Sequence, residues 1–124
     1  MVRFTKAALM FAASFVAVSA ISAAAQDTTP SSGVFKTGQQ IYDLCVSKDA
    51  ADLEQCDYFI MAAHDMIIFY GDTKMAESKI CLPAGTKVVD IRDVILARWR
   101  ADPGALEYSA VSVIRNALNE KYGC

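Results

Sequence analysis

The stretch that decides the fold is CDYFIMAAHDMIIFYG, residues 56–71. Between its two outer tyrosines only His64 and Asp65 are strongly polar, and apolar residues fall on every side of a helical wheel. Such a pattern is typical of a helix that other helices surround. The run is too short to span a membrane, which needs roughly 20 apolar residues. We therefore predict a central helix that ends at Gly71, with Phe59, Ala63 and Met66 in the core.

The N-terminal residues 1–25 have the three parts of a secretory signal peptide. Arg3 and Lys6 come first, an apolar run follows, and small residues precede the predicted cleavage site. An N-terminal membrane anchor is the alternative, although the apolar run is short for one. We expect export, cleavage and release as a soluble periplasmic protein. Residues 26–34 are predicted to be a disordered lead-in, and residues 35–124 a single domain.

The charge of the predicted mature chain limits its partners. The whole chain has a formal net charge of −2, and loss of the two basic signal residues leaves ten basic against 14 acidic residues. A mildly acidic protein is poorly suited to bind nucleic acid or an anionic membrane. We expect neither as a partner after signal cleavage.

The four cysteines all lie in the mature part of the chain. An even number of cysteines in a short exported protein indicates two disulfides. The spacings contain no Cys-x-x-Cys, and a single histidine leaves no plausible zinc site, so we expect no metal and no cofactor. The cysteines are Cys45, Cys56, Cys81 and Cys124.

Helices on both sides of the central one are predicted from capping and periodicity. Thr37 and Gln40 form a capping box before a first helix of about ten residues, and Asp52 begins the central helix. The Asp102-Pro103 pair indicates the start of a fourth helix. A third helix lies before it, and Gly123 closes the fourth. The third has the apolar stripe Val88, Ile91, Ile95 and Trp99, and the fourth has Leu106, Ala110, Val113, Ile114, Ala117 and Leu118. No strand pattern is evident, so the predicted fold is an all-α bundle of about four helices.

The disulfide pairing follows from how such helices pack. Short connections make neighbouring helices antiparallel, which brings Cys45 near Cys56 and Cys81 near Cys124. We favour these two pairs, although the sequence leaves the other two pairings open.

The His64-Asp65 pair is the one feature that suggests catalysis. A histidine and a carboxylate suit general acid–base chemistry, but neighbouring residues on a helix point about 100° apart and do not face each other. No nucleophile is evident, because the cysteines are assigned to disulfides. We predict instead that Asp65 is a buried structural hydrogen-bond acceptor, that His64 lies at the helix surface or a subunit interface, and that the protein is not an enzyme.

Several motifs of the chain resemble the Rap/Tai family of periplasmic immunity proteins, which inhibit peptidoglycan amidase effectors of type VI secretion. They are Gly38-x-x-Ile41-Tyr42-x-x-Cys45, then Cys56-x-x-Phe59-Ile60 with Asp65, then Ile80-Cys81-Leu82-Pro83, Asp102-Pro103 and the terminal Cys124. The resemblance implies a disulfide-bonded helical fold, a homodimer, and a loop that blocks the active-site groove of the amidase. Ala62 departs from the family pattern, which usually has glycine there.

An inhibitor of this kind must contact its partner through exposed segments. We predict the loop 72–79 as the first candidate, with Met75 as an apolar tip among charges, and the corner 100–104 as the second. In Arg98-Trp99-Arg100 we favour a core tryptophan between solvated arginines over a binding hot spot. The alternative function is a small periplasmic stress or acid-response chaperone, or another non-enzymatic binding protein. The predicted contact residues are Asp72, Lys74, Met75, Glu77, Arg100 and Asp102.

Overall fold

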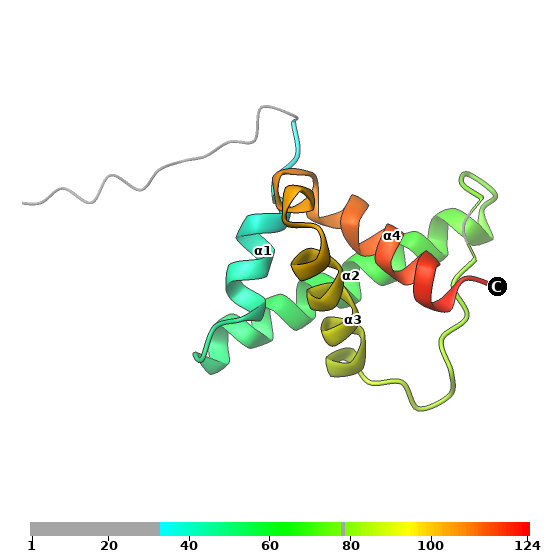
Figure 1. The fold of residues 1–124 in the computed structure, drawn as a ribbon. Helices are drawn as coiled ribbons and strands as arrows, with labels where there is room; N and C mark the ends of the chain where they lie inside the picture. Colours follow the sequence, from blue (N-terminus) through cyan, green and yellow to red (C-terminus); the bar gives the residue numbers. More distant parts are fainter. Residues whose placement is uncertain (1–32, 78) are drawn as a thin grey trace, which may run out of the picture.

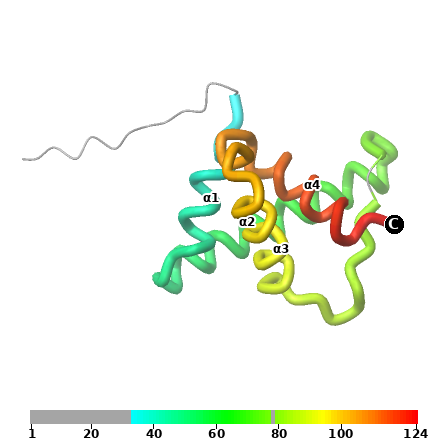
Figure 2. Tube along the Cα trace, viewed as in Figure 1, coloured from blue at the N-terminus to red at the C-terminus, as the bar shows by residue number. Residues whose placement is uncertain are grey.

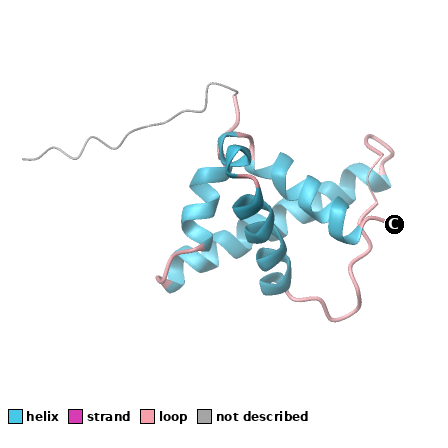
Figure 3. Cartoon of the chain, in the orientation of Figure 1, coloured by secondary structure: helices cyan, strands magenta, loops and turns pink. Residues whose placement is uncertain are grey.

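The computed structural model describes residues 33–77 and 79–124, which form four α-helices and one short 3₁₀ helix (Figure 1). The predicted signal peptide, and the lead-in up to residue 32, lie outside the described residues. Only isolated bridges, and no strands, occur in the described part, so the all-α prediction is confirmed (Figure 3). The elements are α1 (Gly38–Cys45), α2 (Ala50–Asp72), α3 (Val88–Ala101), η1 (Pro103–Glu107) and α4 (Ala110–Tyr122).

Helix α2 is the longest element, and α1, α3 and α4 all pack against it. Figure 2 shows it running diagonally through the molecule, from the side of α1 to the side of the C-terminus. Its buried residues form one stripe at spacings of four, three and four residues, which is one face of a helix. That stripe is Cys56, Ile60, Ala63 and Ile67.

The prediction that protein surrounds α2 on all sides is wrong. Of the three predicted core residues, Ala63 is buried, Phe59 packs against the core half-buried, and Met66 is exposed. The reason is size, because three helices of 8 to 14 residues cannot cover every side of a 23-residue helix. The large apolar residues left exposed on α2 are Tyr58, Met61, Met66, Phe69 and Tyr70.

Both ends of α2 lie outside the predicted limits. Asp49, not Asp52, caps the start, since its carboxylate accepts the amides of Ala51 and Asp52 at 2.8 and 3.3 Å. The helix also continues through Gly71 to Asp72. No helix in the described part of the chain is long and apolar enough to cross a membrane.

Helix α1 begins at the predicted capping box. The Thr37 hydroxyl accepts the Gln40 amide at 3.4 Å, and the Gln40 side chain accepts the Thr37 amide at 3.1 Å. Gly38 lies directly against η1, where an added Cβ would stand 2.9 Å from the Leu106 Cα and the Ala105 carbonyl oxygen. A glycine is therefore required for α1 and η1 to approach this closely.

Helix α4 begins later than predicted. Asp102-Pro103 starts the 3₁₀ helix η1, and α4 starts only at Ala110. Ser109 provides no side-chain cap, but the Ala110 amide donates to the Lys36 carbonyl at 3.1 Å. The Gly38 amide donates to the Tyr108 carbonyl at 2.8 Å, so residues 36–38 and 108–110 pair as a short antiparallel bridge.

The other end of α4 is held in the same way, with a disulfide added. The Cys81 amide donates to the Tyr122 carbonyl at 2.9 Å, and the Cys124 amide to the Lys79 carbonyl at 3.2 Å. Gly123 closes the helix as predicted, and an added Cβ would collide with the Asn119 carbonyl. Both favoured disulfides, Cys45–Cys56 and Cys81–Cys124, are present.

Trp99 closes the core at the α1 side of the molecule. It is 1% exposed and meets the Tyr42 ring edge-on, with centroids 6.1 Å apart. The core interpretation of Arg98-Trp99-Arg100 is therefore confirmed.

Candidate functional site

The chain leaves α2 through a tight turn that positions the predicted contact loop. The Tyr70 carbonyl accepts the Met75 amide at 3.0 Å, and the Gly71 carbonyl accepts the Lys74 amide at 3.1 Å. These two bonds are those of a Schellman motif. Lys74 occupies its left-handed position, with φ of 58°, where glycine is usual. The Gly71 that the sequence singled out instead lies inside the last helical turn.

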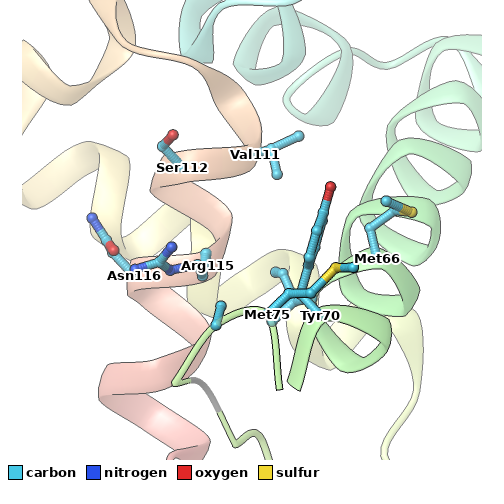
Figure 4. Close-up of a pocket in the computed structure, with 9 residues that line it drawn as sticks. Met66, Tyr70, Met75, Val111, Ser112, Arg115 and Asn116 are labelled. Carbon is cyan, nitrogen blue, oxygen red and sulfur yellow. The ribbon is translucent and has the colours of Figure 1, made fainter. Parts of the chain in front are cut away.

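This turn places Met75 beside an open pocket of about 530 Å³ between α2 and α4. In Figure 4, Met66, Tyr70 and Met75 lie on one side of the pocket and the residues of α4 on the other. Its apolar lining remains accessible, since Met75 is 69% exposed and Met66 and Tyr70 are each more than 40% exposed. The lining residues from α4 are Val111, Ser112, Arg115 and Asn116.

Among the described residues that line this pocket, Arg115 is the one that carries a charge. No carboxylate stands three or four residues before or after it along α4, and it makes no hydrogen bond or ion pair with any described residue. The pocket thus combines an accessible apolar wall with one unpaired guanidinium. The sequence singles out Met75 but not Arg115, since Arg115 lies on the polar face of a separate helix.

The predicted contact residues of the loop are all accessible. Asp72, Lys74, Met75 and Glu77 are exposed, but only Met75 lines the α2–α4 pocket. Lys74 and Glu77 line a second pocket together with Cys124.

The second predicted contact segment, the corner 100–104, is not part of the same surface. Figure 1 shows it beside α1, at the other end of the molecule from the loop. Arg100 and Asp102 are exposed. Asp102 forms an ion pair with Arg98, whose Nη2 lies 3.7 Å from Asp102 Oδ2. The two predicted segments therefore belong to separate surfaces.

Two expectations about His64 and Asp65 are wrong. The side chains do meet, with His64 Nδ1 3.2 Å from Asp65 Oδ1. Asp65 is also exposed, at 83% of its side-chain surface, and is not a buried acceptor. The carboxylate that fills the predicted structural role is Asp57, which accepts from Arg92 of α3 at 2.8 Å and is mostly buried.

The uncovered side of α2 forms a second accessible surface. Tyr58, Met61 and Phe69 lie at helical spacing on it, and Ala62, where the family pattern has glycine, is exposed among them. The Glu54 carboxylate accepts a hydrogen bond from the Tyr58 hydroxyl at 3.0 Å and raises the pKa of Tyr58. We call Tyr58, Met61, Ala62, Asp65 and Phe69 the open face of α2.

The fold, the bridges and the accessible surfaces can be compared with known proteins. The family model of the Rap1a immunity proteins matches residues 37–124, which is the whole helical domain. The chain belongs to this family. The resemblance found in the sequence is thereby confirmed, and its quoted residues span α1 to the terminal bridge. No curated protein and no solved structure gave a significant match.

Proposed function

We propose that this protein is a periplasmic immunity protein that binds a peptidoglycan amidase effector of type VI secretion and occludes its active-site groove. The family match over the complete helical domain carries the proposal. Two disulfides fit an oxidising compartment such as the periplasm. The protein acts by binding rather than by catalysis, and needs no cofactor.

The loop 72–79 is the proposed contact segment. Its turn holds the backbone of Met75 by a hydrogen bond to α2, while the side chain stays exposed. A fixed backbone lowers the entropy lost on binding, and an exposed methionine offers an adaptable apolar contact. Asp72, Lys74 and Glu77 supply polar contacts around it, and the corner with Arg100 and Asp102 is the second proposed segment.

We expect an amidase gene beside the gene of this protein, and the experiment uses its product, with hydrolysis of purified peptidoglycan as the readout. The wild-type protein should abolish hydrolysis at equimolar concentration, and deletion of its gene should sensitise cells to sister cells that deliver the amidase. Met75→Asp should weaken inhibition by at least about tenfold, as expected for a central contact. Phe35→Asp is the matched control, because Phe35 is 96% exposed and its neighbour Lys36 pairs with Ala110 at the start of α4. Full inhibition by Met75→Asp would exclude the loop, and hydrolysis unaffected by the wild-type protein would refute inhibition of this amidase.

We further propose that the protein forms a homodimer through the open face of α2. Large apolar side chains lie exposed at helical spacing around Asp65, and such exposed apolar surface marks a site that a protein partner covers. A two-fold axis would place Phe69 and Tyr58 of both copies in one interface. Sedimentation should show a dimer at micromolar concentration for the wild type and a monomer for Phe69→Asp. A wild-type protein that stays monomeric would refute this assembly.

A further inference from the structure

We infer that the α2–α4 pocket is the anchor site for one loop of the partner protein, and that this loop carries a bulky apolar side chain next to a carboxylate. The inference rests on the proposed function and specifies the chemistry of the partner. It concerns the pocket of Met66, Tyr70, Met75, Val111 and Arg115.

The apolar half of the anchor follows from the wall of the pocket. Met75 and Tyr70 stand side by side in Figure 4, opposite α4. Met66 and Val111 complete the apolar lining. Since Met66, Tyr70 and Met75 are each more than 40% exposed, the pocket does not enclose a small molecule by itself. A protein surface that inserts one apolar side chain would cover both the pocket and its rim.

The carboxylate half follows from Arg115. It is the one charge on the lining and has no partner in the described structure. An arginine binds a carboxylate through two parallel hydrogen bonds, and docking of an apolar group beside it would remove competing water. A basic loop would leave Arg115 facing a like charge in the same desolvated site, which is unfavourable.

The net negative charge of the chain favours a partner loop with a single carboxylate over one with many. With more acidic than basic residues, the protein repels a broadly acidic partner. A single carboxylate beside an apolar residue avoids this repulsion and still pairs with Arg115. Ser112 and Asn116, on the α4 side of the pocket, can donate to the remaining oxygen atoms or backbone carbonyls of the loop.

The first experiment uses a displayed library of random heptapeptides and does not depend on the amidase. The library is selected on the wild-type protein and counter-selected on Arg115→Glu. We expect enriched peptides with an aromatic or aliphatic residue within two positions of Asp or Glu. A synthetic peptide of this type should bind Arg115→Glu at least about tenfold more weakly and Arg115→Lys by an intermediate factor. Peptides that lack a carboxylate, or that bind equally well to Arg115→Glu, would overturn the inference.

The second experiment measures the dissociation constant of the amidase complex. Arg115→Glu should weaken it about 10- to 100-fold, whereas Lys121→Glu should change it less than about threefold. Lys121 is the matched control, since it is an exposed cation on the same helix outside the pocket. Helical circular dichroism and the melting temperature of both variants should equal those of the wild type.

The outcomes separate the inference from the proposed function. If the amidase does not bind the wild-type protein, the proposed function fails, and the peptide selection still decides the chemistry of the pocket. If the amidase binds wild type and Arg115→Glu equally, the proposed function stands and the anchor inference fails. If Arg115→Glu converts a dimer of the free protein into a monomer, the pocket is occupied by a second copy, which also overturns the inference.

Discussion

Each end of α4 is held by a short antiparallel backbone bridge, but the two ends are stabilised in different ways. At its start, residues 36–38 pair with 108–110, Gly38 is buried against the backbone of Ala105 and Leu106, and Ala110 is buried. At its finish, residues 79–81 pair with 122–124, but Cys81 and Cys124 are exposed and joined by a disulfide. The packed end is held by close contact, whereas the open end relies on a covalent link. The loop with Met75 lies beside this open end, since Lys74 and Glu77 share a pocket with Cys124.

Removal of the exposed disulfide should have the largest effect on stability. The Cys81–Cys124 bridge closes 43 residues, and a loop of that length corresponds to roughly 4 kcal/mol of unfolding free energy at 25 °C. Urea unfolding of the double variant Cys81→Ala/Cys124→Ala should show a loss of this size. A loss below about 1 kcal/mol would mean that packing, not the bridge, holds the open end.

The two bridges should also differ in their reaction with a dithiol. Cys45 and Cys56 are buried, whereas Cys81 and Cys124 are exposed to an attacking thiolate. Timed alkylation and peptide mapping in dilute dithiothreitol should therefore show Cys81–Cys124 opening first. Simultaneous opening would show that the burial of the inner bridge gives it no protection.

Disturbance of the packed end should cost somewhat less. Gly38→Ala adds a methyl group that meets the backbone of Ala105 and Leu106, so α1 and η1 must move apart. We expect a loss of about 1–3 kcal/mol in unfolding free energy, as for other overpacked sites. Gly104→Ala is the control on the same turn, since its added Cβ meets only the Asp102 side chain, at 3.4 Å. Equal stability of the two variants would contradict close packing at Gly38.

The covered and open sides of α2 can be compared through two aspartates. Asp57→Asn weakens the mostly buried pair with Arg92, and should cost about 1–2 kcal/mol. Asp65→Asn changes an exposed side chain and should stay within about 0.5 kcal/mol. Thermal unfolding of both variants tests this difference, and a reversed order would restore the structural role that the sequence suggested for Asp65.

The smallest expected effect is a gain in stability at the turn after α2. Lys74→Gly should stabilise the protein by about 0.5–1 kcal/mol, because glycine adopts a positive φ without a steric penalty. Lys74→Ala keeps a Cβ and should give no such gain. Chemical unfolding of both variants measures their free energies of unfolding. A gain in Lys74→Gly alone would show that the backbone conformation, and not the loss of the lysine charge, is responsible.

Much of the fold could be predicted because its signals are local. The capping box at Thr37, the stripe that ends at Trp99, and the bridge pairing depend on spacing and on short connections between helices. The errors arose where tertiary contacts decide. Glycine often ends a helix, which made Gly71 the predicted end of α2, but Lys74 adopts the left-handed conformation of the turn. Asp102-Pro103 suits the start of a 3₁₀ helix as well as that of an α-helix.

Only part of the candidate site could be predicted, again because tertiary contacts decide the rest. Met75 stands out in the sequence as an apolar residue among charges. Arg115 does not, because its significance depends on which helix packs beside α4 and on the absence of a carboxylate partner in the described structure. Likewise, an all-round apolar α2 cannot reveal which of its sides the other helices cover.

Hydrogen exchange of the protein with and without the amidase shows which segments the partner covers. We expect the amidase to protect amides in residues 66–76 and 111–116, on the two sides of the α2–α4 pocket, and to leave those of α1 and η1 unchanged. Protection confined to α1 and η1, with free exchange around Met75 and Arg115, would contradict this prediction.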